Sequence, residues 1–327
     1  MTLRDFAPSV TPSACWGALV SVVVVVAGSA CSSPVSSGSL ACGQLDARDG
    51  EVVLCSELDQ ALVAQIAFPE GEPPAEGWPG IVVLHGSGGL YPGVDGLGCG
   101  LELHDQFALW RDELTAQGFA LIMPASFRSR GFCAWDDRHD VVDNFTAHER
   151  LVVRTFDARA AAQWMCDDPR VDCDALAVLG FSNGASIALM TMHEDLTRLD
   201  DERLVSAGTH PYFKGAVAYY PGCGLQGEFA SSLEEAEESS FYFPYAPVWV
   251  PHAEYDDLLG NCEALRDPQV EILSAQRGIS DDLFGLTIFE DADHGFDLWT
   301  TSSSSSDHEA GLAAQPVAIG LFETWLD

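Results

Sequence analysis

Short apolar segments alternate with longer amphipathic segments over most of this chain, and this alternation constrains its fold more than any other feature. The segments with strand character are EVVLCSE, LVAQIAFP, GIVVLHG, FALIMPA, ALAVLGF, GAVAYYP, APVWVPHA and FGLTIFEDA. The segments with helical spacing are FALWRDELTAQG, ERLVVRTFDARAAAQWM, GASIALMTMHEDL and GLAAQPVAIGLFETWL. The first two strands are typical of an antiparallel hairpin. The remaining strands are apolar and are separated by helices, which predicts a mainly parallel sheet with helices on both faces.

Residues 50–327 are predicted to form one domain, since they contain no internal repeat and no linker strong enough to divide them. Two polar stretches between strands, 194–213 and 226–240, are interpreted as surface insertions. The segment TSSSSSDHEAG, 301–311, is expected to be a polar loop before the last helix.

Residues 1–30 have the features of a secretory signal peptide. An apolar stretch from about Trp16 to Ala27 is too short to span a bilayer comfortably and ends in small residues. The sequence GSAC is similar to the lipobox of bacterial lipoproteins and predicts a lipid on Cys31, although Gly28 stands where that motif has an aliphatic residue. Residues 31–49 would then be a Ser-rich tether. We expect a protein exported to the bacterial cell envelope or secreted, with a membrane contact only through that lipid.

Cysteine usage agrees with export. Ten cysteines less Cys15 and Cys31 leave an even number, which suits disulfide bonding in an oxidising compartment. Spacing alone does not determine connectivity, but it suggests the pairs Cys42–Cys55, Cys99–Cys133, Cys166–Cys173 and Cys223–Cys262. Metal binding is the alternative, and the sequence lacks both C-x-x-C and H-E-x-x-H.

The chain is strongly acidic, with 50 Asp and Glu residues against 15 Lys and Arg and a formal net charge of −35. Such a charge repels nucleic acids and anionic membrane surfaces, so neither is expected as a partner. The acidic run DDRHDVVDN, 136–144, lacks the spacing of a calcium-binding loop and is interpreted as solvated.

The sequence GFSNG, 180–184, places a serine between two glycines directly after the predicted strand ALAVLGF and before a predicted helix. This is the context of a nucleophile elbow, in which small residues at Gly180 and Gly184 permit a sharp turn. The turn presents Ser182 at a helix N-terminus, where N–H groups and the helix dipole favour negative charge. An ordinary turn that happens to contain a serine is the alternative. We predict that Ser182 is a nucleophile.

A serine nucleophile needs a base, and His294 is the best placed of nine histidines. It follows the strand FGLTIFEDA, so its loop can reach across the carboxyl edge of the sheet. His252 is the main rival and can equally be a structural histidine. The acid is expected in HAEYDDLLG, where Asp256 is preferred and Asp257 is the alternate, because adjacent carboxylates cannot both face one histidine. The order Ser, Asp, His is that of an α/β-hydrolase.

The Gly-rich sequence VVLHGSGGL follows the first long buried strand and predicts an oxyanion hole. By position its donor is the N–H of Ser87, and the N–H of Asn183 is the second donor. As a nucleotide-binding motif this sequence fails, because the third glycine of G-x-G-x-x-G and the P-loop lysine are both missing. No metal or organic cofactor is expected.

Six segments occur in the order and at the spacing of the dienelactone hydrolase family of α/β-hydrolases, which the chain resembles from about residue 50 to its end. They are VVLHGSGGL, SFRSRGF, DPRVDCDALAVLGFSNGA, AVAYYPGC, HAEYDDLLGNC and DADHGFD. The resemblance implies an α/β-hydrolase fold with nucleophile, acid and base at Ser182, Asp256 and His294. The namesake enzymes use a cysteine nucleophile, so their lactone specificity is not implied. Arg128 and Arg130 match a region that often approaches the site, where they could bind a substrate carboxylate; a surface ion pair is the alternative.

These observations together predict an exported serine hydrolase that cleaves a small-molecule ester or lactone through an acyl-enzyme. A peptidase or acyltransferase with the same three residues is the nearest alternative. A non-catalytic binding protein of the cell envelope with the same fold is an alternative from a different class.

Overall fold

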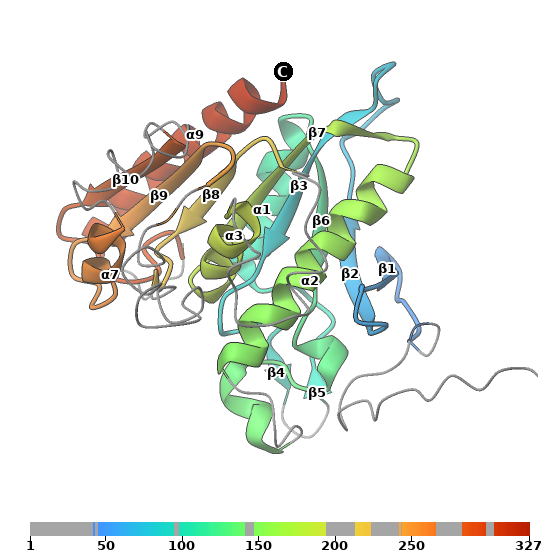
Figure 1. Cartoon of the computed structure of the whole chain (residues 1–327), viewed down its shortest axis with the longest axis horizontal. Helices are drawn as coiled ribbons and strands as arrows, with labels where there is room; N and C mark the ends of the chain where they lie inside the picture. The colour runs from blue at the N-terminus through green and yellow to red at the C-terminus, as the bar shows by residue number, and fades with distance from the viewer. Residues whose placement is uncertain are drawn as a thin grey trace, which may run out of the picture. The chain divides into compact units, whose positions relative to one another are not determined.

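Eight strands of the described chain form one sheet (Figure 1). The structure, a computed structural model, describes residues 42, 45–94, 98–140, 147–193, 213–223, 242, 244–265, 283–298 and 304–327. In chain order the strands are β1 (Glu51–Cys55), β2 (Ala61–Ala67), β3 (Trp78–Leu84), β6 (Ala120–Pro124), β7 (Val171–Phe181), β8 (Ala216–Tyr219), β9 (Val248–Ala253) and β10 (Phe284–Phe289).

The strands lie side by side in the order β1-β2-β6-β3-β7-β8-β9-β10. The pairs β1–β2 and β2–β6 are antiparallel, and every other neighbouring pair is parallel. The predicted opening hairpin and the predicted mainly parallel sheet are therefore confirmed. All six parallel strands end at one edge, called the carboxyl edge below.

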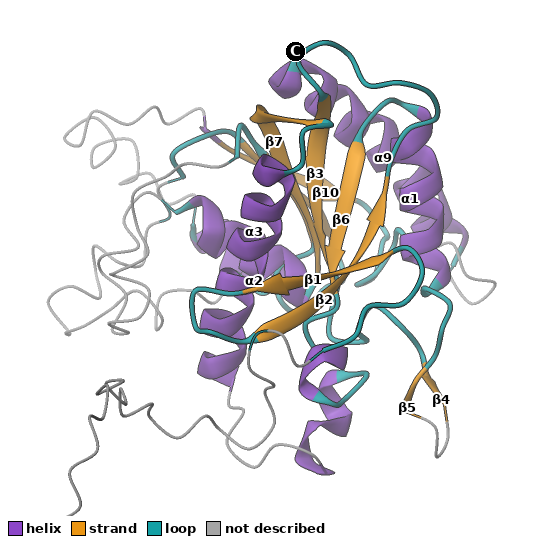
Figure 2. Ribbon diagram, turned by 90° about the vertical axis from the view of Figure 1, so that its right-hand side faces the viewer, coloured by secondary structure: helices purple, strands orange, loops and turns teal. Residues whose placement is uncertain are grey.

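Helices cover both faces of this sheet, as predicted (Figure 2). Helices α2 (Ala147–Asp167) and α3 (Asn183–Met192) cover one face, and α1 (Asp105–Ala116) and α9 (Ser305–Leu326) cover the other. Alternate residues of β3 supply the two cores, since Val82 packs on the α2–α3 side and Val83 on the α1–α9 side. Because both sets are buried, the strands read as continuous apolar runs in the sequence.

The remaining elements are short. They are the ribbon β4 (Gly93–Val94) and β5 (Gly98–Cys99), two 3₁₀ helices (Arg128–Arg130 and Trp135–Asp140) and helix α7 (Leu259–Ala264). They lie in the connections between the strands and helices of the main sheet.

Helix α9 begins earlier than the sequence pattern predicts. Residues 305–311, expected in a polar loop, form its first turns. The hydroxyl of Ser304 accepts a hydrogen bond from the N–H of Asp307 at 3.1 Å, and the Asp307 carboxylate accepts one from the N–H of Ser304, also at 3.1 Å. This capping box satisfies N–H groups at the helix start and extends the helix through a serine-rich segment that lacks apolar periodicity.

All four predicted disulfide pairs are present: Cys42–Cys55, Cys99–Cys133, Cys166–Cys173 and Cys223–Cys262. Two of them lie near the carboxyl edge. Cys99–Cys133 joins β5 to the segment between the two 3₁₀ helices, and Cys223–Cys262 joins the segment after β8 to α7. These crosslinks restrict the unfolded chain more strongly as the closed loop grows, and these two close the longest loops, with separations of 34 and 39 residues.

The predicted signal peptide, most of the predicted tether and, apart from Phe213, the two predicted insertions lie outside the described residues. Within the described part of the chain, no helix has both the length and the apolar character needed to cross a membrane.

Candidate active site

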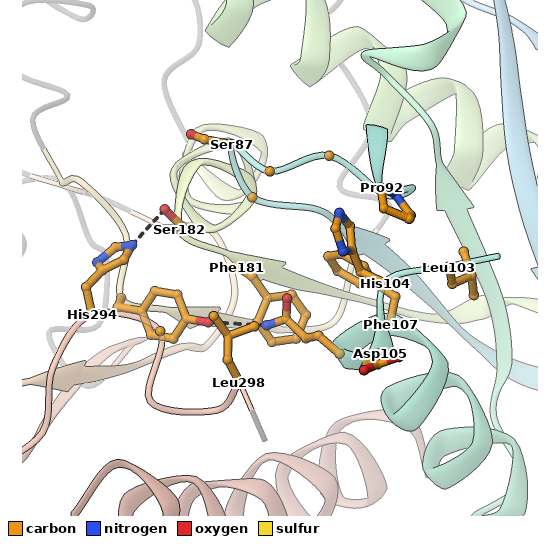
Figure 3. A pocket seen from close by; sticks show the side chains of 16 residues that line it. Ser87, Pro92, Leu103, His104, Asp105, Phe107, Phe181, Ser182, His294 and Leu298 are labelled. Carbon is orange, nitrogen blue, oxygen red and sulfur yellow. Dashed lines mark hydrogen bonds between the residues drawn. The ribbon is translucent and has the colours of Figure 1, made fainter. Parts of the chain in front are cut away.

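Ser182, Asp256 and His294 follow three different strands at the carboxyl edge. Ser182 comes directly after β7, while Asp256 and His294 lie in the loops after β9 and β10. Parallel strands bring residues that are far apart in the sequence to one edge, which is why open α/β sheets bind ligands there. Figure 3 shows Ser182 and His294 pointing toward each other at the side of a pocket.

The backbone at Ser182 has the strained geometry of a nucleophile elbow, with φ 52° and ψ −115°. The glycines on either side permit this turn. A Cβ atom at Gly180 would overlap the backbone of Gly184 and Ala185, and one at Gly184 would overlap the carbonyl oxygens of Leu84 and His85. The turn therefore packs directly against the end of β3 and presents the Ser182 side chain to the pocket.

A continuous hydrogen-bonded chain joins the three side chains. The Ser182 hydroxyl donates to Nε2 of His294 at 2.9 Å, and Nδ1–H of His294 donates to Oδ2 of Asp256 at 2.5 Å. The other carboxylate oxygen of Asp256 accepts the N–H of Leu258 at 3.0 Å. The Asp256 side chain is 4% exposed and that of His294 is 39% exposed, whereas Asp257 is exposed and has no part in this chain. This arrangement can hold an imidazole in the tautomer that accepts a serine proton.

His252, the rival base, is hydrogen-bonded to the backbone rather than to Ser182. Its Nε2 is 3.2 Å from the carbonyl oxygen of Pro221, and its Nδ1 accepts the N–H of Ala253 at 3.0 Å. Nδ1 is 3.7 Å from Oδ2 of Asp256, which is too far for a hydrogen bond. Burial lowers the pKa of His252, which favours its neutral form. These contacts are those of a structural histidine.

The loop after β3 passes directly beside Ser182. A Cβ atom at Gly86 would lie 3.3 Å from the carbonyl oxygen of Phe181 and 3.4 Å from Cβ of Ser182, so only glycine allows this approach without a shift. Ser87 lines the same pocket as Ser182, and its N–H donates no hydrogen bond within the described part of the chain. The N–H of Asn183 belongs to the first turn of α3, where helical N–H groups have no partner within the helix. Both predicted oxyanion donors thus flank Ser182.

Arg128 and Arg130 do not reach the pocket, and this corrects the idea that they bind a substrate carboxylate. Arg128 is paired with Glu51 and lies over the ring of Tyr91. Arg130 makes a two-pronged contact with Asp157 at 2.8 and 2.9 Å. The ion-pair alternative describes both residues, but the pairs are mostly buried rather than on the surface. Each guanidinium is already neutralised by a carboxylate of the chain itself.

The pocket beside Ser182 has a volume of about 540 Å³, within the usual range for small-molecule sites. Pro92, Leu103, Phe107, Phe181 and Leu298 contribute apolar walls (Figure 3). The charged or titratable groups on its described lining, apart from the hydroxyl of Tyr220, are His104, Asp105 and His294, with no lysine or arginine among them. An apolar acyl or alcohol group fits such walls better than a charged one.

One group of potential metal ligands occurs within the described residues. It consists of Cys42, Cys55 and Asp59 and lies outside the pocket. Both cysteines are joined in a disulfide and cannot act as thiolate ligands. This group therefore offers only one carboxylate to a cation.

Comparison with protein families identifies a match to the model of the dienelactone hydrolase family over residues 64–325. The chain belongs to the dienelactone hydrolase family. This match begins within β2, covers every later strand of the main sheet and includes Ser182, Asp256 and His294.

Several solved structures superpose on this chain. A protein described as a dienelactone hydrolase, from Klebsiella pneumoniae, superposes with a TM-score of 0.57 at 16% identity, covering 83% of this chain and 97% of the other. A dienelactone hydrolase-like promiscuous phosphotriesterase from metagenomic libraries gives 0.55 at 16% identity, with coverages of 85% and 98%. An esterase from Pyrobaculum calidifontis gives 0.53 at 18% identity, with 84% of each chain covered. No curated protein sequence matches significantly. These structural likenesses show an α/β-hydrolase fold.

Sequence reasoning missed a buried polar cluster in this member of the dienelactone hydrolase family, centred on Asp297. Its carboxylate accepts hydrogen bonds from Gln106 at 2.7 Å, from the indole N–H of Trp110 at 3.2 Å and from the hydroxyl of Tyr220. The Tyr220 ring in turn packs against the His294 ring, with centroids 4.7 Å apart. The cluster therefore holds the Tyr220 ring that packs against the imidazole of His294. Asp297 follows His294 closely in DADHGFD, but nothing in that motif signals its burial.

The buried Asp297 carboxyl should make the free energy of unfolding depend on pH. Burial raises its pKa to about 6, an effect limited by its hydrogen bonds from Tyr220, Gln106 and Trp110. A carboxyl whose pKa is raised by folding binds its proton more tightly in the folded chain, so its contribution to stability falls as pH rises from about 4 to about 6. The amide introduced by Asp297→Asn cannot titrate, so we expect the free energy of unfolding of this variant, taken relative to that of wild type at the same pH, to be about 2–3 kcal/mol higher at pH 7 than at pH 4. Urea unfolding of both proteins at the two pH values measures this change, and parallel pH profiles would contradict it.

Proposed function

We propose that this chain is an exported serine hydrolase that cleaves a carboxylic ester or lactone through an acyl-enzyme. The observation that carries the proposal is the hydrogen-bonded chain from Ser182 through His294 to Asp256, which ends at a pocket with apolar walls. Membership of a family of hydrolases supports it. The name of the Pyrobaculum protein, an esterase, is consistent with the same chemistry.

In this proposal the Ser182 oxygen attacks the carbonyl carbon while His294 accepts the serine proton at Nε2. The carbonyl oxygen becomes an oxyanion and receives hydrogen bonds from the N–H groups of Ser87 and Asn183. His294 then protonates the leaving alcohol, which leaves an acyl group on Ser182. Water, activated by His294, releases the acid and restores the serine. Asp256 holds the imidazole in place throughout and stabilises its protonated form.

The residues that line the pocket further support a preference for uncharged substrates over anionic ones. Asp105 lies on its lining, and the described lining contains no arginine or lysine to hold a carboxylate. The two arginines expected in that role are paired with Glu51 and Asp157. The net charge of −35 adds a long-range repulsion against anions at low salt. The same repulsion favours release of the carboxylate product.

Two esters with the same leaving group test this proposal. 4-Nitrophenyl butyrate is neutral, and mono-4-nitrophenyl succinate has a similar acyl chain that ends in a carboxylate. We expect kcat/KM to be at least ~10-fold higher for the neutral ester in low salt, and the ratio to shrink as salt screens the charges. Asp105→Asn should reduce the ratio, because it removes one carboxylate from the pocket wall. Equal rates, or faster turnover of the succinate, would contradict the charge preference, whereas turnover of neither ester would count against the hydrolase itself.

Export rests on the N-terminal sequence and on the disulfides. Within this proposal residues 1–30 direct secretion, Cys31 carries a lipid, residues 31–49 form the tether and residues 50–327 form the hydrolase domain. The four disulfides of the described chain support an oxidising compartment. Cys31→Ser should therefore move the protein from the membrane fraction of an expressing bacterium to the soluble fraction. An unchanged distribution would exclude this anchor.

A further inference from the structure

Arg154, on helix α2, contacts both segments that flank Ser182, and no sequence motif draws attention to it. Its side chain is completely buried. One guanidinium N–H donates to Oδ1 of Asn183 at 2.5 Å, and another donates to the carbonyl oxygen of His85 at 2.6 Å. Asn183 is the first residue of α3, and His85 begins the loop that contains Ser87. A single side chain thus ties together the two segments whose N–H groups are the proposed oxyanion donors.

The charge of Arg154 has no direct carboxylate partner within the described residues. The nearby Asp157 uses both oxygens to bind Arg130, and Cζ of Arg154 lies over the ring of Phe127, 5.0 Å from its centre. An unpaired buried charge is costly, because the interior solvates it poorly. Burial accordingly lowers the pKa of the Arg154 guanidinium. The guanidinium therefore brings an uncompensated positive charge close to both segments beside Ser182.

The contacts around His85 extend the effect of Arg154 to the Ser87 N–H. The His85 ring is fully buried, and burial together with the Arg154 charge holds its pKa well below the ordinary value, so the ring is neutral. With its proton on Nδ1, this ring donates to the carbonyl oxygen of Gly86 at 2.8 Å. The same carbonyl accepts the N–H of Gly89 at 3.2 Å. Because the Gly86 carbonyl and the Ser87 N–H belong to one planar peptide unit, these bonds orient the proposed oxyanion donor.

We propose that Arg154 is a positioning residue for the oxyanion hole: it fixes the loop of Ser87 and the N-terminus of α3 relative to each other, and its positive charge favours negative charge developing between them. This inference rests on the proposed hydrolase function. The charge acts from a low-dielectric interior, where electrostatic effects on a transition state are larger than in water. Arg154 itself does not line the pocket, so its influence passes through Asn183 and His85.

The test compares Arg154→Met and Arg154→Lys with Arg130→Lys in the full-length protein. Arg130 is a matched control, because it is also a buried arginine packed against α2 but binds Asp157, Ser126 and Gln60 instead. With the ester that wild type turns over best, we expect Arg154→Met to lower kcat by about 100-fold with KM changed less than about threefold. Arg154→Lys keeps the positive charge, but its ammonium lacks the planar set of donors that binds both partners of the guanidinium. We therefore expect its kcat to lie between those of Arg154→Met and wild type. Arg130→Lys should lose thermal stability with kcat within about threefold of wild type.

A second readout separates positioning from a general loss of structure. The Ser182 hydroxyl can add to the carbonyl carbon of an alkyl trifluoromethyl ketone, and the resulting hemiketal places an oxyanion in the proposed hole. The matching trifluoromethyl alcohol has no carbonyl and binds only non-covalently. We expect the ketone affinity to fall in parallel with kcat/KM across the Arg154 variants, and the alcohol affinity to stay near that of wild type. If Arg154→Met does not fold, the ratio of ketone to alcohol affinity in Arg154→Lys carries the same test.

Two results would overturn the inference. One is an Arg154→Lys or Arg154→Met protein that folds and keeps wild-type kcat and ketone affinity. The other is equal loss of ketone and alcohol affinity, which indicates a collapsed pocket rather than a misplaced oxyanion hole. Failure of the proposed function looks different, because wild type would then hydrolyse no ester and would not bind the ketone covalently.

Discussion

Ser182→Ala is expected to lower kcat for the best ester substrate by about 10⁵- to 10⁶-fold, because it removes the atom that forms the acyl-enzyme. The variant should also lose covalent labelling by a fluorophosphonate probe, which needs no knowledge of the substrate. In the wild type, mass spectrometry should place the adduct on the peptide that contains Ser182. The fold should survive, since the strained turn is set by Gly180 and Gly184 and by packing against β3.

Ser186→Ala is the matched control for this change. Ser186 lies one turn further along α3, and its hydroxyl accepts the N–H of Gly222 at 3.0 Å rather than contacting His294. We expect this variant to keep labelling and most of its activity. A folded wild-type protein that is not labelled, or a Ser182→Ala protein that still turns over the ester, would remove Ser182 from the mechanism. The non-catalytic envelope binding protein would then become the leading alternative.

Asp256→Asn is expected to lower kcat by about 10⁴-fold with little change in KM. The carboxylate accepts Nδ1–H of His294 at 2.5 Å and so leaves Nε2 free to take the serine proton. An amide can turn its NH₂ toward Nδ1 and stabilise the opposite tautomer, in which Nε2 carries a proton and cannot act as a base. Steady-state kinetics and a melting curve, measured on the same sample, separate this effect from unfolding.

Asp257→Asn distinguishes the two adjacent acids. Its carboxylate is exposed and does not take part in the chain from Ser182 to Asp256. We expect its kcat to stay within about threefold of wild type, as for most exposed substitutions. A larger loss in Asp257→Asn than in Asp256→Asn would reverse the assignment of the acid.

Much of the fold follows from local patterns that the sequence displays directly. The apolar runs of β3, β6 and β7 predict buried parallel strands, because both of their faces are covered and each residue must be apolar. The sequence GFSNG after β7 predicts the sharp turn at Ser182, because only glycine tolerates the backbone contacts found at Gly180 and Gly184. The four disulfide pairs are those suggested by spacing. The family is also recognisable from its six motifs.

The partners of charged side chains could not be predicted in the same way. Arg128 and Arg130 stand in a segment that suggests substrate binding, yet Glu51 and Asp157, which neutralise them, lie 77 and 27 residues away. The early start of α9 depends on one capping box rather than on apolar spacing. In each case the deciding interaction is a specific contact between polar groups, which has no periodic signature.

The sequence by itself determined the order of the main strands and helices, the disulfide candidates, the serine Ser182 and a short choice of partners for it, because each follows from local composition or from position after a strand. The tertiary structure alone decided that His294 rather than His252 contacts Ser182 and that Asp256 rather than Asp257 contacts His294. It also decided which carboxylates pair with the arginines, and that Arg154 joins the two segments beside the serine. The physical reason is that burial and hydrogen bonding depend on distance in space. The parallel sheet brings His85, Arg154 and Asn183 together from three separate elements that no local pattern connects.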